Sequence, residues 1–162
     1  MPLLSLWKAD PQAVKQLTIE QIVATAGDGR LRDSSECQSE LREFLSQAGV
    51  EALGQYADYC LTNAFQKSGQ VLQDIVNELG RRLEYQVTNG RYQGSVSSVG
   101  FDGMWNDLSG QRIVVEVKTT DAYRLSLDTV VGYRDRLLEQ KTLTDPCSVL
   151  LVVGRSDTGE LV

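Results

Sequence analysis

The chain of 162 residues contains no histidine, and this absence excludes several kinds of active site. A Ser-His-Asp triad, a nuclease with a histidine base and a zinc hydrolase with histidine ligands all depend on that side chain. Acid–base chemistry in this protein must therefore use carboxylates, lysine, tyrosine or a metal-bound water molecule.

Cysteine is also scarce, with only Cys37, Cys60 and Cys147 in the chain. A structural zinc site needs closely spaced ligands, and these three cysteines are far apart in the sequence. Their odd number and apolar neighbours predict buried thiols rather than disulfides. We therefore expect a protein of a reducing compartment, the cytoplasm.

Long apolar runs are missing as well. No segment approaches the roughly 18 consecutive apolar residues that cross a bilayer. The first ten residues, MPLLSLWKAD, lack the basic start and the long apolar core of a signal peptide. We therefore expect no membrane as a partner.

Positive charge is in deficit, because 16 Lys and Arg residues face 22 Asp and Glu residues, which gives a net charge of −6. Affinity for phosphate comes largely from Lys and Arg. The balance therefore argues against unaided binding to nucleic acid. Metal ions in an acidic site, or a clustering of the basic residues, would offset the deficit.

The first 67 residues predict a helical region. Pro11 follows Asp10, an arrangement typical of a helix N-terminus. The segments TIEQIVATA, SELREFLSQA and EALGQYADYCLTNAF have apolar residues at helical spacing. We interpret residues 1–67 as a helical N-terminal extension used for packing or assembly.

Residues 68–162 predict a second domain with a different pattern. An amphipathic helix over 70–83 precedes strands that begin near residue 85 and span about 99–105 and 112–118. A helix over 127–138 and a buried strand, SVLLVVG, follow. The step from Lys118 to Ser148 predicts a parallel strand pair with a right-handed crossover. The predicted fold class is α/β, a mixed central β-sheet flanked by helices.

The sequence stops shortly after the last expected strand. No helix is expected to cover that flank of the sheet. We therefore expect either a C-terminally truncated domain or an edge that a partner covers, such as a second copy of the chain in a homo-oligomer.

The Val- and Ile-rich strand over 112–118 carries Glu116 and Lys118, two residues apart. Alternate residues of a strand share one face, so these two charges point the same way. A hairpin centred on Ser109 would place Asp102 directly opposite Glu116, with the Cβ atoms roughly 4.5–5.5 Å apart. Two carboxylates at that spacing repel unless a cation lies between them. The pattern predicts a divalent-metal site with a lysine beside it.

The expected order of helix, strand, strand, strand, helix and strand (α-β-β-β-α-β), with D…E-x-K on the second and third strands, resembles the core of the PD-(D/E)XK, restriction-endonuclease-like family. The resemblance covers about residues 69–153 and is closest to Mrr-type restriction endonucleases. GFDGMW stands for the first acid motif and VVEVKTT for the second, and Phe101 stands where the family name has proline. The residues that match the first helix of the family are Gly69, Leu72, Val76, Leu79, Leu83 and Tyr85.

This resemblance implies a DNA endonuclease that hydrolyses phosphodiester bonds with Mg²⁺, for which Mn²⁺ would substitute. Asp102 and Glu116 would hold the metal. The backbone carbonyl of Val117 would add a ligand, and Lys118 would orient the attacking water.

The family often places a further acid in its first helix, where this chain has Gln73. Gln73 is assigned to the site by alignment, with Glu78 as the alternate acid. Because a second metal needs another carboxylate, the glutamine favours one metal over two.

Several other side chains are candidates for contacts with nucleic acid. Arginine and hydroxyl groups commonly bind phosphates. A tyrosine in the helix over 127–138 is similar to that of the Q-x-x-x-Y helix in recombination-type exonucleases, but Thr129 stands in place of the glutamine, so the chain is not assigned to that subgroup. The candidates are Arg91, Thr119, Thr120, Arg124, Tyr133 and Arg134. Two alternatives stay open: a catalytically inactive module of the same fold for binding or assembly, and a metal-dependent enzyme that acts on RNA or a nucleotide.

Overall fold

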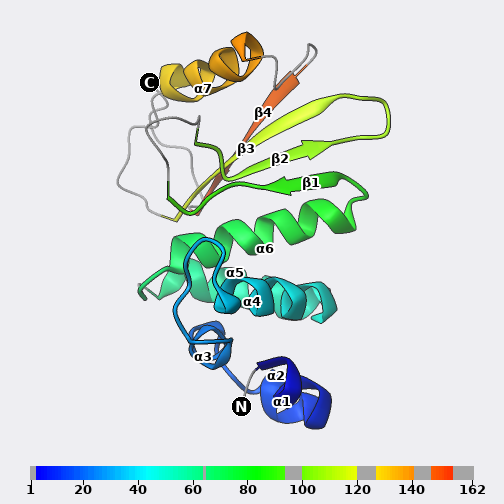
Figure 1. The fold of residues 1–162 in the computed structure, drawn as a ribbon, viewed down its shortest axis with the longest axis vertical. Coiled ribbons are helices and arrows are strands. Elements are labelled where there is room, and N and C mark those ends of the chain that lie inside the picture. Colours follow the sequence, from blue (N-terminus) through cyan, green and yellow to red (C-terminus); the bar gives the residue numbers. More distant parts are fainter. Residues whose placement is uncertain (1–2, 64, 94–99, 120–126, 141–146, 155–162) are drawn as a thin grey trace. The chain divides into compact units, whose positions relative to one another are not determined.

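The computed structural model describes residues 3–63, 65–93, 100–119, 127–140 and 147–154 (Figure 1). The chain divides into two compact units, Met1–Glu78 and Leu79–Val162. This division falls inside a helix, whereas the sequence pattern placed the domain boundary between residues 67 and 68.

The first unit is helical. Its elements are α1 Leu3–Ala9, α2 Pro11–Lys15, α3 Ile19–Thr25, α4 Glu36–Gln47, α5 Val50–Thr62 and the greater part of α6 Ser68–Arg82. The predicted N-cap is confirmed at α2, where Asp10 Oδ1 accepts a hydrogen bond from the Ala13 amide at 3.0 Å. Thr18 caps α3 and Ser35 caps α4 in the same way. These helices therefore begin at side chains that satisfy otherwise unpaired amides.

Aromatic packing and an ion pair stabilise the helical unit. Phe44 of α4 lies edge-on to Trp7, with 5.3 Å between the ring centroids, and 6.2 Å from the ring of Tyr56 in α5. Arg42 Nε donates to Asp74 Oδ1 at 2.9 Å, which joins α4 to α6. The side chain of Asp74 is completely buried, and the ion pair with Arg42 stabilises its charge there.

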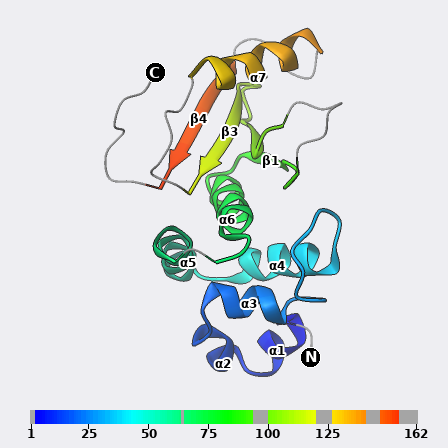
Figure 2. The same cartoon turned by 90° about the vertical axis from the view of Figure 1, so that its left-hand side faces the viewer.

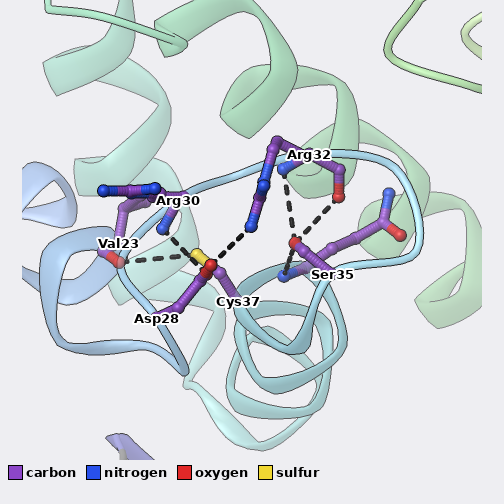
Figure 3. A network of polar contacts seen from close by, with 7 residues as sticks. Val23, Asp28, Arg30, Arg32, Ser35 and Cys37 are labelled. Carbon is purple, nitrogen blue, oxygen red and sulfur yellow. Dashed lines mark hydrogen bonds and ion pairs between the residues drawn. The ribbon is translucent and has the colours of Figure 1, made fainter.

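The loop between α3 and α4 is held by its own polar groups (Figure 3). Asp28 Oδ1 accepts from the Arg30 amide at 3.1 Å, and the Asp28 carboxylate forms an ion pair with Arg32. Ser35 Oγ accepts from the Arg32 amide at 3.3 Å and donates to the Arg32 carbonyl at 2.8 Å. These contacts are local, and they give the charged residues of the loop a structural role.

The second unit contains a four-stranded sheet in the order β1-β2-β3-β4 (Figures 1 and 2). The strands are β1 Gln86–Asn89, β2 Gly103–Asn106, β3 Arg112–Lys118 and β4 Cys147–Val153, and helix α7 is Leu127–Glu139. Strands β1, β2 and β3 pair antiparallel, whereas β3 and β4 run the same way, as Figure 2 shows. The predicted α/β class, mixed sheet and parallel pair are confirmed.

The core of this unit differs from the expected α-β-β-β-α-β order. Only the end of α6, from Leu79 onward, belongs to the sheet unit, so the described part of this unit has three strands, one complete helix and a last strand. Residues 71–78 of α6 belong to the helical unit and are all buried. The second strand is also shorter than predicted, because it begins at Gly103 rather than near residue 99.

The last turn of α6 packs against β2 through a glycine. A Cβ atom on Gly80 would come within 2.5 Å of the Trp105 indole, so the missing side chain makes room for that ring. The Trp105 ring also lies 5.5 Å from the ring of Tyr85, centroid to centroid. The helix ends where the amides of Glu84 and Tyr85 donate to the carbonyls of Arg81 and Gly80, at 3.0 and 3.1 Å. Glu84 has a φ of 68°, at a position that helix ends usually fill with glycine.

One face of the sheet is covered by α7. The buried cluster on this face consists of Met104, Val114 and Leu137, with Phe101, Leu138, Cys147 and Val149 packed against it. Side chains alternate along a strand and match across a pair. Asp102, Glu116 and Lys118 are therefore assigned to the same face, near the C-terminal end of β3.

The cysteines are free thiols. Cys37 and Cys60 are buried as predicted, and burial is the main cause that raises their pKa values, to about 11 and about 12. Cys37 Sγ also donates to the Val23 carbonyl at 3.5 Å (Figure 3). Cys147 is only half-buried, contrary to the prediction, because it begins the outermost strand of the described sheet.

Candidate metal centre

The β2–β3 hairpin has the predicted register. Its four residue pairs are centred on Ser109, as the pairing of Gly103 with Val115 illustrates. Asp107 closes the turn, because its Oδ1 accepts from the Gln111 amide and the Ser109 hydroxyl, both at 2.8 Å. This pairing brings the charged residues of β3 next to the acid that precedes β2.

Asp102 departs from the regular ladder. Its amide donates to the Val115 carbonyl at 3.0 Å, although Val115 is the register partner of Gly103. The side-chain Oδ2 of Asp102 accepts from the Val117 amide at 2.7 Å, in place of a main-chain carbonyl. Asp102 and Gly103 thus both face Val115 of β3. This arrangement is a β-bulge, a feature over-represented beside active sites.

The carboxylate of Asp102 is half-buried and lies close to a second acid. Burial and the Glu116 carboxylate raise the pKa of Asp102 to about 6, while the Val117 amide and the Lys118 ammonium act in the opposite direction. On its main-chain side, the Asp102 carbonyl accepts from the Gly90 amide at 2.9 Å. The two acids repel each other, and a cation between them would remove the repulsion.

Glu116 and Lys118 form an ion pair on β3. Lys118 Nζ donates to Glu116 Oε1. The Lys118 side chain is 44% exposed, whereas that of Glu116 is 10% exposed. Among the residues that the structure describes, no donor reaches Oε2 of Glu116. Carboxylate oxygens are ligands that Mg²⁺ prefers, so this oxygen of Glu116 is suited to bind a cation.

The main-chain carbonyl of Val117 is a third oxygen at this position. The N–H and C=O groups of one residue point to the same side of a β-strand. The Val117 carbonyl therefore points toward β2, as does the amide that binds Asp102. No amide in the described ranges donates to this carbonyl, because the ladder is interrupted at the bulge. Its position is compatible with the predicted role as a metal ligand.

These oxygens suit one hard cation. Mg²⁺ and Mn²⁺ prefer carboxylate, carbonyl and water oxygens, and Mg²⁺ keeps several water ligands. Within the described parts of the chain, no group of three or more His, Cys, Asp or Glu side chains is arranged to hold a metal. The donor set therefore fits an ion that completes its shell with water, and it does not form a cage of acidic side chains.

The two predicted helix residues belong to the other unit of the chain. Gln73 and Glu78 are both buried, in the portion of α6 that belongs to the helical unit. Their participation in the metal site therefore stays a prediction.

The candidates for nucleic-acid contact lie in different environments. Arg91 is exposed, and Thr119 is half-buried directly after β3. Arg134 donates from Nε to Cys147 Sγ at 3.2 Å and lies 3.8 Å from the carboxylate of Asp135, so α7 and β4 already engage its guanidinium. Thr120, Arg124 and the side chain of Tyr133 lie outside the described residues.

Gly90 is a neighbour of Asp102 that the sequence did not single out. It is buried, and its amide contacts the main chain of Asp102. The available signal was a glycine directly after a strand, which is equally typical of an ordinary turn. Only the three-dimensional pairing of β1 with β2 distinguishes a glycine that contacts the main chain of Asp102 from a glycine of an ordinary turn.

Comparisons with known proteins give no relative for this chain. No family model matches it, and neither a curated protein nor a solved structure does so. None of the helices in the described ranges is long and apolar enough to cross a membrane. The function must therefore be inferred from the chemistry of the site.

Proposed function

We propose that the sheet unit is a divalent-metal-dependent nuclease that hydrolyses phosphodiester bonds in DNA, with a PD-(D/E)XK, restriction-endonuclease-like core. The observation that carries this proposal is the β2–β3 hairpin, which presents two carboxylates and a main-chain carbonyl beside a lysine. Mg²⁺ is the proposed metal, and Mn²⁺ is its substitute.

In this proposal, Asp102, Glu116 and the carbonyl of Val117 hold the ion. When bound, the metal neutralises charge on the scissile phosphate and lowers the pKa of a water ligand. With a pKa of about 6, the carboxyl group of Asp102 is mainly ionised at neutral pH and so is ready to bind a cation. The hydrogen bond from the Val117 amide fixes the orientation of this carboxylate.

Lys118 is the residue proposed to orient the attacking water and to stabilise the negative charge that develops on the phosphate. Its side chain is partly exposed, so the ammonium group can reach a bound substrate. The ion pair with Glu116 keeps that group beside the proposed metal ligand.

The distribution of charge supports a nucleic-acid substrate for the sheet unit. Residues 1–78 contain six basic and eleven acidic residues, a net charge of −5, whereas residues 79–162 contain ten basic and eleven acidic residues, a net charge of −1. Most of the negative charge of the chain thus belongs to the helical unit. A nearly neutral unit whose acidic site holds a cation repels phosphates less than a unit with a large negative charge does.

A catalytically inactive module of the same fold is the second candidate. It is favoured by the glutamine at position 73, and by the lack of a group of three metal-ligating side chains in the described ranges. An enzyme that acts on RNA or on a nucleotide is an alternative for the same site and the same metal.

Metal binding by the full chain is the first test. Calorimetric titration with Mn²⁺ is expected to show one site in the wild type and at least about tenfold weaker binding in Asp102→Asn and Glu116→Gln, because each loses a charged ligand. Asp107→Asn is the matched control, because Asp107 is an acid of the same hairpin that closes the turn and does not face the site. Its affinity is expected to equal that of the wild type.

Cleavage is the second test. Supercoiled plasmid DNA with Mg²⁺ is expected to be nicked or linearised by the wild type and to stay intact with Lys118→Ala. Arg136→Ala, which removes an exposed positive charge of α7, controls for charge alone. Cleavage of RNA but not DNA would assign the other polymer, and metal binding without cleavage of either would support the inactive module. Mn²⁺ binding that is absent, or that Asp102→Asn leaves unchanged, would rule out the metal site.

A further inference from the structure

We propose that Gly90 is a positioning residue, which sets the main chain of Asp102 so that its carboxylate meets Glu116. The purpose of this positioning is metal binding by Asp102, so the inference rests on the proposed function. Gly90 lies directly after β1 and is buried. It acts through Asp102 and needs no contact with the substrate.

The main chain of Gly90 pairs with that of Asp102. The register of β1 with β2 ends with Asn89 opposite Gly103, and one further step places Gly90 opposite Asp102. The Gly90 amide donates to the Asp102 carbonyl at 2.9 Å. Asp102 is thus held from two strands, through its carbonyl by Gly90 and through its Oδ2 by Val117.

There is no room for a side chain at Gly90. A Cβ atom would lie 1.7 Å from the carbonyl oxygen of Phe101, 2.7 Å from its carbonyl carbon and 2.9 Å from the carbonyl carbon of Asp102. Ordinary contacts between such atoms lie at about 3.5–4.0 Å. Because the overlapping atoms are main chain, no change of rotamer can relieve the overlap. The φ of Gly90 is not in the left-handed region, so the glycine is needed for space.

Any larger residue at position 90 must push β1 away from the bulge that carries Asp102. A displacement of about 1 Å is enough to disturb a site, since such misplacement can reduce a rate by about 10²-fold. The buried core cluster on the α7 face consists of residues from β2, β3 and α7; Phe101 packs against it, and Gly90 is not part of it. We therefore expect the sheet to form in Gly90→Ala while the carboxylate of Asp102 is misplaced.

The matched control is Gly100→Ala. Gly100 lies two residues before Asp102, and a Cβ atom there would meet nothing within 4 Å. Mn²⁺ affinity is measured by calorimetry in the wild type and in both variants. Hydrogen exchange of the Val117 amide is followed by NMR without metal, because this amide reports directly on the position of Asp102 Oδ2. Circular dichroism and thermal unfolding establish that each variant is folded.

The expected result for Gly90→Ala is Mn²⁺ binding weakened at least about tenfold and faster exchange of the Val117 amide, with both unchanged in Gly100→Ala. A folded Gly90→Ala with wild-type affinity, or with a Val117 amide as protected as in the wild type, would overturn the proposal. If the wild type binds no Mn²⁺, the proposed function fails, whereas the Val117 amide still shows whether Gly90 positions Asp102. If Gly90→Ala does not fold, the wild type decides: Mg²⁺ should slow exchange of the Gly90 amide, and unchanged exchange would refute the inference.

Discussion

Replacing Asp102 by asparagine is expected to stabilise the metal-free protein at neutral pH, although it removes a proposed metal ligand. Burial and the nearby Glu116 raise the pKa of Asp102 from 3.8 to about 6 in the folded protein. The ionised carboxylate is therefore less favourable in the folded state than in the unfolded chain. Asparagine keeps an oxygen that can accept from the Val117 amide, and it has no charge to repel Glu116.

The sign and size of the effect follow from the two pKa values of Asp102. Below pH 3.8 the carboxyl group is protonated in both states, so its contribution to stability is fully present. As the pH rises, the unfolded chain loses its proton first, and the contribution is lost as the pH passes about 6. Since one pKa unit corresponds to about 1.36 kcal/mol, the loss at neutral pH is about 3 kcal/mol.

Urea unfolding in EDTA measures this difference. Asp102→Asn is expected to exceed the wild type by about 3 kcal/mol at pH 7.5 and by about 1 kcal/mol at pH 4.5. Asp107→Asn is a control of opposite sign, because the Ser109 hydroxyl and main-chain amides lower the pKa of Asp107. That variant should be less stable than the wild type at pH 7.5, with a smaller difference at low pH.

Two results would refute this reasoning about Asp102. One is an Asp102→Asn chain that is no more stable than the wild type at pH 7.5, and the other is a difference that does not change with pH. The metal provides a further check, because Mg²⁺ at about 100 times its dissociation constant should stabilise the wild type by about 2.7 kcal/mol. The same concentration should stabilise Asp102→Asn by no more than about 1.4 kcal/mol, because binding weakened at least about tenfold leaves the ion at most about ten times above its dissociation constant.

Three further substitutions test the packing. Glu84→Gly is expected to stabilise the protein by about 1 kcal/mol and so to raise the thermal midpoint, because Glu84 has a φ of 68°, which is unfavourable for a residue with a Cβ atom. A lower midpoint would contradict this. Gly80→Ala is expected to destabilise by about 1–3 kcal/mol in urea unfolding, because its Cβ would meet the ring of Trp105; an unaffected midpoint would argue against that contact. Arg42→Ala is expected to cost about 3–5 kcal/mol, because it removes the arginine that pairs with the buried carboxylate of Asp74. A much smaller cost is expected in an Asp74→Asn background.

The hairpin is the part of the site that could be predicted from the sequence. Its pairing depends on the alternation of residues 112–118 and on the turn around Ser109, and both signals lie within a few residues of each other. A slip of one residue would move every side chain to the opposite face. The register of β2 with β3 was therefore strongly specified. Asp102 was expected directly opposite Glu116, but it lies at the bulge, where its amide donates to the Val115 carbonyl.

The bulge at Asp102 could not be predicted, because it depends on a choice between two acceptors. The Val117 amide can bind a main-chain carbonyl of the facing strand or the carboxylate of Asp102, and the pattern of residues is the same in both cases. The structure has the carboxylate as the acceptor. The overlap that a side chain at Gly90 would cause arises from the pairing of β1 with β2, which is also a non-local property.

The assignment of α6 to one unit was unpredictable for a similar reason. Its apolar stripe identified a helix correctly, but that stripe does not determine which neighbours the helix joins. Asp74 is paired with Arg42, 32 residues earlier in the sequence, and periodicity does not reveal such a contact. Most of α6 therefore belongs to the helical unit, although the sequence pattern placed the whole helix with the sheet.

The energetics of Asp102 favour a working metal site over an inert module. Its raised pKa costs about 3 kcal/mol at neutral pH, against a total stability of about 5–15 kcal/mol for a typical domain. Asparagine at this position would accept the same hydrogen bond without that cost, so a module that only packs or assembles gains nothing from the acid. Lys118 already pairs with Glu116 and does not cancel the shift of Asp102. A divalent cation shared by the two carboxylates would cancel it, and strongly shifted pKa values are concentrated at functional sites for this kind of reason.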